Sequence, residues 1–197
     1  MSIFKRGFAA LFLVTALLSL SACGVNTIPT LDEKVNASWA QVQNQYQRRS
    51  DLIPNLVETV KGYAAHEEKT LTEVIQARAN ATKVTLSPEM LSDPAAVQKF
   101  EQSQGQLTSA LSRLMVVSEK YPDLKANTNF IALQSQLEGT ENRITVARQD
   151  YITTVQEYNT NVRTFPGLIW AMIYHVKPKA NFTATTPGAE TAPVVKF

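Results

Sequence analysis

The residues of this chain that could carry chemistry are one cysteine, two histidines and a few charged side chains at otherwise apolar helical positions. The cysteine, Cys23, stands at the end of the stretch LSAC, residues 20–23. An apolar run, residues 7–20, precedes it and follows two basic residues, Lys5 and Arg6. A basic start, a short apolar run and small residues before a break are typical of a secretory signal peptide. We therefore expect residues 1–22 to be a signal peptide and residues 23–30 to form a tether.

The stretch LSAC resembles the bacterial lipobox, in which the thiol of the first mature residue receives a diacylglycerol and its amine a further acyl chain. Two or more acyl chains hold a soluble domain stably at a membrane, because each buried methylene contributes ~0.8 kcal/mol. The alternative is a cysteine that lies by chance at the end of an ordinary signal peptide or an uncleaved anchor. We predict that Cys23 is lipidated. By resemblance to Gram-negative lipoproteins, Gly24 after the cysteine favours the outer membrane.

Charged side chains interrupt the apolar repeats of the predicted helices. Arg49 and Glu67 occupy seam positions of the first helical stretch. Glu141 and Arg148 do so in the last stretch, where Glu138 adjoins them. A charge that faces a core needs a partner, because an unpaired buried charge is costly. One interpretation is a polar pocket inside the bundle that receives a ligand or a partner group. The other, which we favour, is a structural layer of ion pairs that fixes the register of the helices.

The remaining candidates do not match a known catalytic or metal site. His66 has Tyr63 three residues before it, so the Glu-x-x-His motif of di-metal bundles fails. His175 has no acidic neighbour, and a single cysteine rules out a heme attachment motif. The sequence has no Gly-x-Ser-x-Gly, Gly-rich phosphate loop or His-Glu-x-x-His. We expect no metal, no cofactor beyond the covalent lipid, and no enzymatic activity.

The charge balance argues against a nucleic-acid partner. The full chain has 19 basic and 17 acidic side chains, for a net charge of +2. Removal of Lys5 and Arg6 with a signal peptide leaves 17 against 17 and a net charge of zero. Proteins that bind nucleic acid need clustered positive charge to replace counterions. We therefore set that class aside.

Apolar positions recur at helical spacing along most of the chain. One set of positions seven residues apart begins at Val35, and a second set offset by four begins at Trp39. This spacing predicts one long helix over residues 31–82, packed along the seam of a bundle. Pro54 lies inside it and lacks a backbone donor, so we expect a kink or a break near Asp51. The unchanged register on both sides favours the kink.

Two further helical stretches follow. The pair Asp93-Pro94 predicts an N-cap and a first helical position, and an apolar stripe then runs over residues 97–121. A third stripe, over residues 130–165, has apolar residues every seven positions. Helices without an alternating period predict an all-α antiparallel bundle. We expect three to four long helices over residues 31–176, followed by an extended tail, residues 177–197.

Two smaller features, an apolar run near the C-terminus and three glycines inside helical patterns, each have two interpretations. The apolar run LIWAMIYHV, residues 168–176, is too short to span a membrane. It can close the end of the bundle, which we favour, or dip into a membrane surface through Trp170 and Tyr174. Gly62, Gly105 and Gly139 lie inside helical patterns, where glycine costs about 1 kcal/mol relative to alanine. We favour close helix packing at these glycines over local hinges.

Long strings of the sequence resemble the LemA family of bacterial envelope proteins. They are WAQVQNQYQRRSDLIPNLVETVKGYAAHE (residues 39–67), YPDLKANTNFIALQSQLEGTENRITVARQDY (residues 121–151) and EYNTNVRTFPG (residues 157–167). The resemblance covers essentially the whole chain after residue 26 and implies an α-helical bundle in the bacterial envelope. Many members keep an uncleaved N-terminal anchor, whereas this chain has a lipobox-like stretch. The family has no settled biochemical activity, so the resemblance implies no mechanism.

These observations together predict a periplasm-facing lipoprotein of the bacterial cell envelope, held at the membrane by its lipid. Its bundle would bind an envelope protein as a scaffold, because long helices offer a tall, mostly neutral surface for helix docking. The alternative function is a small-ligand-binding module that uses the polar layer around Arg49 and Arg148.

Overall fold

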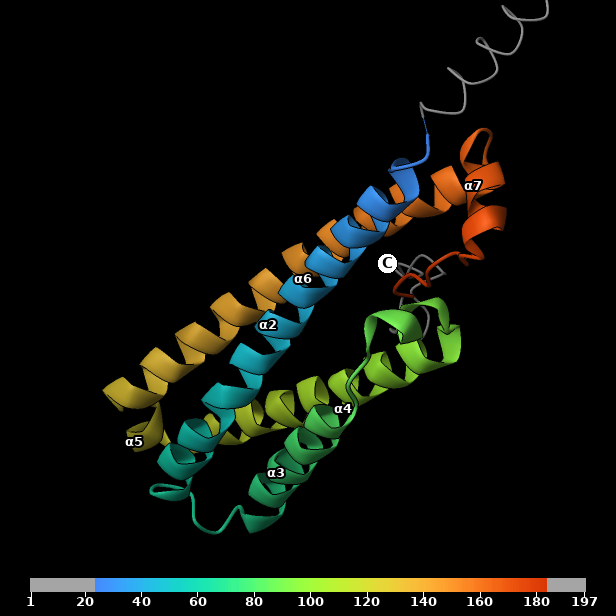
Figure 1. Ribbon diagram of the computed structural model, residues 1–197. Helices are drawn as coiled ribbons and strands as arrows, with labels where there is room; N and C mark the ends of the chain where they lie inside the picture. Colours follow the sequence, from blue (N-terminus) through green and yellow to red (C-terminus); the bar gives the residue numbers. More distant parts are fainter. Residues whose placement is uncertain (1–23, 184–197) are drawn as a thin grey trace, which may run out of the picture.

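The computed structural model describes residues 24–183, which form helices joined by short loops, with no strand among them (Figure 1). The predicted all-α bundle is confirmed, and its four long helices are α2, α3, α4 and α6. The predicted signal peptide, Cys23 and residues 184–197 of the predicted tail lie outside the described residues. The elements in chain order are α2 (Thr27–Lys61), α3 (Glu68–Lys83), the 3₁₀ helix η1 (Pro88–Ser92), α4 (Pro94–Ser118), α5 (Pro122–Lys125), α6 (Thr128–Arg163) and α7 (Gly167–Tyr174).

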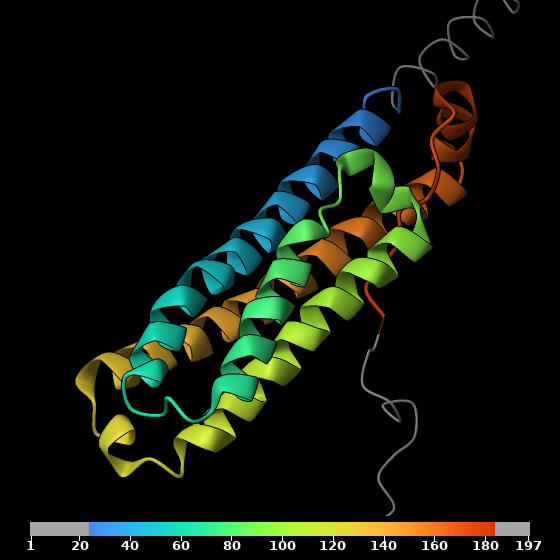
Figure 2. The ribbon, with the colours of Figure 1, turned by 90° about the horizontal axis from the view of Figure 1, so that it is seen from below.

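The long helices form two antiparallel pairs. The first pair is α2 with α6, and the second is the hairpin of α3 and α4 (Figures 1 and 2). Helix α2 also packs on α3 and so joins the two pairs, whereas α4 and α6 approach each other closely at few positions. The side of the bundle between α4 and α6 is therefore the open one.

Side chains define where two of the long helices begin. Asp93 accepts a hydrogen bond from the backbone N–H of Ala95 at 2.9 Å, with Pro94 in the first helical position, so the predicted N-cap of α4 is confirmed. Asn127 caps α6 in the same way, accepting from the N–H of Phe130 at 3.0 Å. Each cap satisfies one of the backbone donors that a helix leaves free at its start.

The single helix predicted over residues 31–82 is wrong, because the chain breaks after Lys61. Helix α2 continues through Pro54, in agreement with the unchanged register, and ends at Lys61, with Gly62 as its C-cap. The chain then turns, with hydrogen bonds from the N–H of Ala64 to Val60 O at 2.8 Å and from the N–H of Glu67 to Ala64 O at 3.0 Å. Ala64 is buried in this turn, so the break has its own packing contact and lets α3 fold back along α2.

Two hydrophobic clusters make up the interior. The aromatic core lies toward the start of α2, and the aliphatic core toward the α2–α3 and α4–α5 turns. The aromatic core includes Trp39, Tyr46, Phe100, Tyr151, Tyr158 and Phe182. The aliphatic core includes Ile53, Leu56, Val60, Val74, Leu107 and Leu114. A bundle packed along one continuous apolar seam would have a single hydrophobic core, so the apolar seam is interrupted between these two clusters.

The packed part of the chain is longer than the predicted residues 31–176. Ile28 is buried in the aromatic core, so α2 already packs within the region predicted as tether. After α7 the extended residues 176–183, which we call the strap, also belong to the bundle. Phe182 lies in the aromatic core, Ala180 N donates to Leu91 O at 2.7 Å, and Tyr151 Oη donates to Ala180 O at 3.0 Å. The strap therefore ties η1 to α6 on the open side.

The apolar run after Pro166 closes the end of the bundle only in part, because one side of α7 packs on the aromatic core and the other side is exposed. Only Gly167 and Ala171 of α7 are buried, while most of its large apolar side chains are exposed. Gly167 is required where it stands, because a Cβ there would collide with the carbonyl oxygen of Asn161 in α6. Among residues 24–183, no helix has both the length and the hydropathy needed to span a membrane.

The favoured explanation of two internal glycines is also wrong. A Cβ placed at Gly105 in α4 or at Gly139 in α6 would have no neighbouring atom within 4 Å. Close helix packing therefore does not require either residue. At Gly62 the nearest atom to such a Cβ is Thr59 O at 3.5 Å, an ordinary contact. This glycine marks the end of α2 rather than a close approach.

Candidate functional site: a charged layer and its cleft

Arg49 lies in the middle of α2, at the boundary between the two hydrophobic clusters. Tyr46, one turn before it, belongs to the aromatic core, and Ile53, one turn after it, belongs to the aliphatic core. The Arg49 side chain is only 1% exposed. A guanidinium cannot lose its charge in a protein, so its burial requires partners from the surrounding helices.

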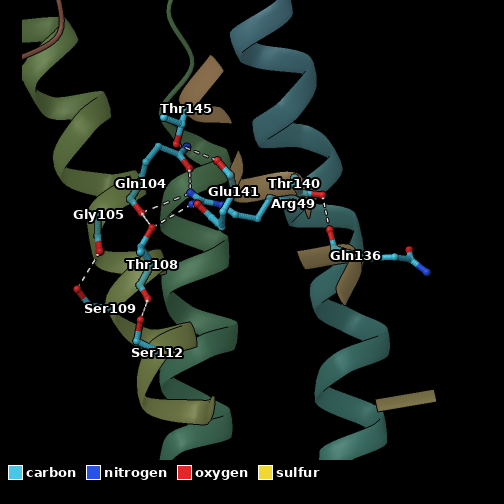
Figure 3. Close-up of polar contacts among 10 residues, drawn as sticks. All are labelled: Arg49, Gln104, Gly105, Thr108, Ser109, Ser112, Gln136, Thr140, Glu141 and Thr145. Carbon is cyan, nitrogen blue, oxygen red and sulfur yellow. Dashed lines mark hydrogen bonds and ion pairs between the residues drawn. The ribbon is translucent and has the colours of Figure 1, made fainter. Parts of the chain in front are cut away.

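Three side chains from α4 and α6 converge on this guanidinium (Figure 3). Arg49 Nη1 donates to Glu141 Oε1 and to Thr108 Oγ1, both at 2.9 Å. Arg49 Nη2 donates to Gln104 Oε1 at 2.6 Å. Gln104 Nε2 in turn donates to Ala81 O in α3 at 3.2 Å. We call Arg49, Gln104, Thr108 and Glu141 the charged layer. Through these contacts it connects all four long helices.

A second ion pair lies on the aromatic side of the charged layer. Arg148 Nη2 in α6 donates to Glu101 Oε1 in α4 at 3.0 Å. The strap completes this site: Thr183 donates to Glu101 Oε2 from Oγ1 at 2.9 Å and to Oε1 from its backbone N–H at 3.2 Å. The guanidinium of Arg148 stands 4.3 Å from the ring centre of Phe182, which is a cation–π distance. The second pair therefore ties α4, α6 and the strap.

The two ion pairs differ in which member is buried, the cation or the anion. In the first, the cation is buried and its partner Glu141 is 38% exposed at the side chain. In the second, the anion is buried, Glu101 being 1% exposed, and its partner Arg148 is 29% exposed. The exposed member of each pair reaches solvent on the open side of the bundle. Each buried charge also has neutral hydrogen-bonding partners, as a buried pair needs.

Tyr46 lies next to both arginines. The guanidinium carbon of Arg49 is 5.0 Å from the centre of its ring. Burial raises the pKa of the Tyr46 phenol, and the positive charges of Arg148 and Arg49 oppose part of that increase. The phenol therefore stays neutral at physiological pH and acts as a packing and hydrogen-bonding group rather than as a base.

The exposed members of the two pairs border an open cleft of about 1070 Å³ between α3, α4 and α6. Its lining includes Glu101, Thr108, Arg113, Glu141 and Arg148. The cleft therefore offers both cationic donors and anionic acceptors, together with hydroxyl and amide groups. This mixture of groups suits the binding of a polar or charged group.

The structure brings some of the predicted site residues together and separates others. Arg49 and Glu141 form the centre of the charged layer, and Arg148 lies beside it in the second pair. Glu67 and Glu138 do not join them, so their inclusion in one polar layer is wrong. Glu67 precedes α3 and accepts from Tyr121 Oη at 3.1 Å, a hydrogen bond that raises the pKa of that phenol. Glu138 is exposed and accepts from Gln134 within the same helix at 3.0 Å.

Sequence reasoning missed four residues of the site: Glu101, Gln104 and Thr108 in α4, and Thr183 in the strap. A signal for Gln104 was present, because it stands on a seven-residue repeat with Val97 and Leu111, both buried. A polar residue on an apolar repeat is a candidate partner for a buried charge. Glu101 and Thr108 lie one turn away from this position and carry no comparable signal.

No group of histidine, cysteine and acidic side chains suitable for a metal ion occurs within residues 24–183. His175 ends α7 in the left-handed backbone region, with its Nδ1 placed 2.6 Å from Met172 O. Its position at the end of the bundle keeps it apart from the charged layer in the middle of the helices.

Comparison with known proteins finds a family match over most of the chain. Residues 38–197 match the LemA family. Among curated relatives, magnetosome protein MamQ of Magnetospirillum gryphiswaldense is 24% identical over 92% of this chain and 78% of its own length. Magnetosome protein MamQ 2 of Paramagnetospirillum magneticum is 24% identical over 90% of this chain and 71% of its own length. Protein LemA of Metamycoplasma hominis is 23% identical over 68% of this chain and 57% of its own length. The resemblance seen in the sequence is therefore confirmed, and this chain belongs to the LemA family.

Proposed function

We propose that this protein is a lipid-anchored scaffold of the bacterial cell envelope. In this proposal residues 1–22 are removed as a signal peptide, Cys23 carries the lipid, and the bundle faces the periplasm, with the outer membrane as its site. The similarity to magnetosome proteins and to LemA supports a membrane-associated bacterial protein. The bundle then serves as the part that binds another envelope protein.

The observation that carries the proposal is the position of Gly24. The described chain starts at one end of α2, far from the α2–α3 and α4–α5 turns (Figure 1). A helix of 35 residues is about 50 Å long. An anchor at Cys23 therefore leaves the turns at the other end, which we call the distal turns (residues 62–67 and 119–127), free to reach a partner. Pairing of the buried charges within the bundle favours a structural frame over an active site.

Lipidation is tested by the mass of the mature protein. Isolated from its own membranes, the chain is expected to begin at Cys23 and to carry acyl chains, and the Cys23→Ser variant is expected to lack them. An unmodified Cys23, or equal incorporation of a fatty-acid analogue into the Cys23→Ser variant, would contradict the anchor.

Partner binding is tested by cross-linking in intact envelopes. A photo-reactive residue at Lys120, which is exposed in the distal turns, is compared with one at Lys34, which is exposed near the start of α2. We expect one stoichiometric adduct from position 120, lost in the Cys23→Ser form. Absence of an adduct at position 120 in correctly lipidated protein would count against the scaffold.

A second function rests on the cleft. Its volume of about 1070 Å³ and its mixed polar lining suit a small charged or zwitterionic ligand. Native mass spectrometry of protein taken from envelopes is expected to show a bound compound if this function holds. Gly105→Trp places a large side chain into the cleft and should displace the compound, whereas Val116→Trp, outside the cleft lining, should not. No bound compound in the unaltered protein excludes this function under envelope conditions.

A further inference from the structure

We infer that α7 lies on the membrane and inserts its exposed apolar face into the bilayer surface. This inference rests on the membrane anchoring in the proposed function and adds a second membrane contact, which would orient the bundle. The observations that carry it are the distribution of apolar side chains on α7, the charges that flank the helix, and its contacts with the first described residues.

Helix α7 has one face toward the bundle and one toward solvent. Gly167 and Ala171 are buried, and Trp170 is half-buried against the aromatic core. The opposite face carries four large aliphatic side chains, spaced so that they form two adjacent rows along the helix. Two of them, Met172 and Ile173, are 60% and 57% exposed. The four are Leu168, Ile169, Met172 and Ile173.

Phe165 adds a further exposed apolar side chain just before the start of the helix. It is 75% exposed and directly precedes Pro166 and α7. We call Phe165 and the four aliphatic residues of α7 the apolar face. Scattered single apolar residues on a surface are ordinary, whereas a contiguous exposed group marks a contact with a partner or a membrane.

The charges around α7 fit a bilayer surface. Residues 164–174 contain no charged side chain. Two exposed cations flank the helix, Arg163 on one side and Lys177 on the other. Helices that lie in a membrane interface combine an apolar face with basic residues, which meet anionic headgroups. Trp170 stacks on Tyr174 with ring centres 6.3 Å apart, and these two residue types are enriched at membrane interfaces.

Helix α7 also lies beside the point where the chain leads to its anchor. Tyr174 Oη donates to Val25 O at 3.2 Å. Trp170 Nε1 lies 3.1 Å from where a Cβ on Gly24 would stand, so the indole packs directly against that residue. Figures 1 and 2 both show the start of α2 next to α7. Cys23 and the apolar residues 7–20 precede Gly24 in the chain, so an anchored N-terminus holds α7 close to the bilayer.

The same contacts argue for a bilayer over other occupants. A second copy of the chain or a protein partner would also cover apolar side chains. Neither explains why the apolar face lies at the anchored end rather than at the distal turns, which a partner reaches more freely. With two contacts, one through the anchor and one through α7, the bundle takes a defined tilt instead of swinging on a tether.

The test uses the full chain, isolated from its membranes and reconstituted into vesicles of phosphatidylethanolamine and phosphatidylglycerol. An environment-sensitive fluorophore is attached at Met172→Cys and, as the matched control, at Val116→Cys, an exposed apolar residue of α4. A fraction of the lipids carries a nitroxide on the acyl chain. Because an inserted face lies about 5–10 Å into the headgroup and acyl boundary, we expect a blue shift and several-fold stronger quenching at residue 172 than at residue 116.

A second variant separates insertion from mere proximity. The change Ile169→Asp with Ile173→Asp should abolish quenching at residue 172, whereas Ile75→Asp with Val116→Asp, on exposed sites elsewhere, should not. Equal quenching at residues 172 and 116, or quenching that survives the α7 aspartates, overturns the inference. A blue shift without quenching that grows with protein concentration assigns the apolar face to a second copy and overturns it as well.

The outcome can be separated from that of the proposed function. The mass at Cys23 reports the anchor in the same sample, and a parallel labelling of unaltered protein corrects for any free Cys23. Lipidated protein with an unquenched residue 172 rejects the α7 contact alone. Quenching at residue 172 in protein without lipid keeps the α7 contact and rejects the anchor.

Discussion

The two ends of the bundle are built on different principles. At the aromatic core, large rings meet edge to face: Trp39 stands 5.2 Å from Phe100 and 5.4 Å from Tyr151, measured between ring centres. Short helices and an extended segment also pack at this end, namely η1, the buried side of α7 and the strap. The aliphatic core has branched side chains and alanines between four helices, and only Phe130 among its buried residues is aromatic. It is completed by short turns and by Leu124 of α5.

At the aromatic end, side-chain hydrogen bonds hold an extended segment in place. Tyr151, Tyr158 and Asn159 of α6 each bond to the backbone of the strap. Such bonds are needed because an extended segment cannot satisfy its own backbone groups, whereas helices do so internally. The charged layer lies between the two ends, and its hydrogen bonds to all four long helices couple them.

The largest effect is expected for Trp39→Ala. Its indole is buried, contacts three other rings, and donates from Nε1 to Leu86 O at 3.3 Å. Truncation of a buried tryptophan lowers the free energy of unfolding by about 3–5 kcal/mol, and urea unfolding measures the loss.

Hydrogen exchange then tests the division between the two ends. Trp39→Ala should speed amide hydrogen exchange in the strap and around η1 by local opening. In the aliphatic core, exchange should become faster only by the amount that the lower free energy of global unfolding requires. The matched control, Leu114→Ala, removes a buried residue of the aliphatic core and should show the reverse pattern. Identical exchange patterns in the two variants would mean that the bundle unfolds as one unit.

The next largest effect distinguishes the two ion pairs. Arg148→Met leaves the buried Glu101 carboxylate without its cation, and an unpaired buried charge is strongly destabilising, so we expect a loss of about 3 kcal/mol. Glu141→Gln also leaves a buried charge, Arg49, without its counter-charge, but the glutamine Oε1 can still accept a hydrogen bond from Arg49 Nη1, so we expect a smaller loss of about 1–2 kcal/mol. Urea unfolding of both variants measures the difference. A larger loss of stability in Glu141→Gln than in Arg148→Met would mean that the first ion pair, not the second, depends more on its exposed member.

The double replacement tests whether the second pair stabilises at all. Replacing Glu101 and Arg148 together by apolar residues of similar volume should restore most of the stability lost in Arg148→Met, because no buried charge remains. Thr183 would still lose its acceptor on Glu101, so recovery should be incomplete. No recovery would indicate that the carboxylate itself holds the strap in place.

Much of this architecture was predictable because helical periodicity reports on which face is buried. The stripes starting at Val97 and Phe130 each became one long helix, the stripe starting at Val35 became the two helices α2 and α3, and Asp93 capped α4 as expected. The break at residues 62–67 was not predictable from spacing. Buried apolar residues resume at Leu71 and Val74 on the far side of the turn. The same apolar pattern is therefore compatible with one continuous helix and with two helices joined by a turn.

The candidate site was only partly predictable, because sequence position does not say which helix faces which. Arg49 was identifiable as a charge on an apolar seam, but its partners lie in α4 and α6, at tertiary contacts. The role of Glu101 depends on Thr183 in the strap, a segment whose composition of threonine, alanine and proline suggested only an extended tail. Contacts between remote irregular segments leave no periodic signal.

An alkaline test addresses the buried tyrosines of the aromatic end. Burial raises the pKa of Tyr158 to about 12, with a smaller contribution from Asp32, and burial also raises the pKa values of Tyr151 and Tyr46. A group with a raised pKa in the folded state stabilises fully below its unfolded pKa, near 10 for tyrosine. That stabilisation falls as the pH rises from 10 through 12. Tyr158 therefore contributes a slope of up to about 1.4 kcal/mol per pH unit in this range.

Tyr158→Phe provides the control for this test. It removes a hydrogen bond to Lys177 O of 3.3 Å, so we expect a loss of about 1 kcal/mol or less at pH 8. Above pH 10 its stability should fall less steeply than that of the unaltered chain, measured by urea unfolding at a series of pH values. Parallel curves would mean that Tyr158 does not titrate with unfolding.

The smallest effect concerns the glycines next to the charged layer. Gly105 follows Gln104 in α4, and Gly139 precedes Thr140 in α6, both inside helices and both with free space at the Cβ position. Alanine restricts the unfolded chain and suits a helix better than glycine, so each substitution should stabilise by about 0.5–1 kcal/mol. The two stabilising effects should be additive, because the residues lie on different helices that approach each other closely at few positions.

If the glycines instead let the two ends of the bundle move about the charged layer, Gly105→Ala and Gly139→Ala would stabilise the fold while weakening partner binding at the distal turns. Unchanged cross-linking from position 120 in the doubly substituted protein would show that the two ends form one rigid unit. The charged layer would then connect the two ends without acting as a hinge.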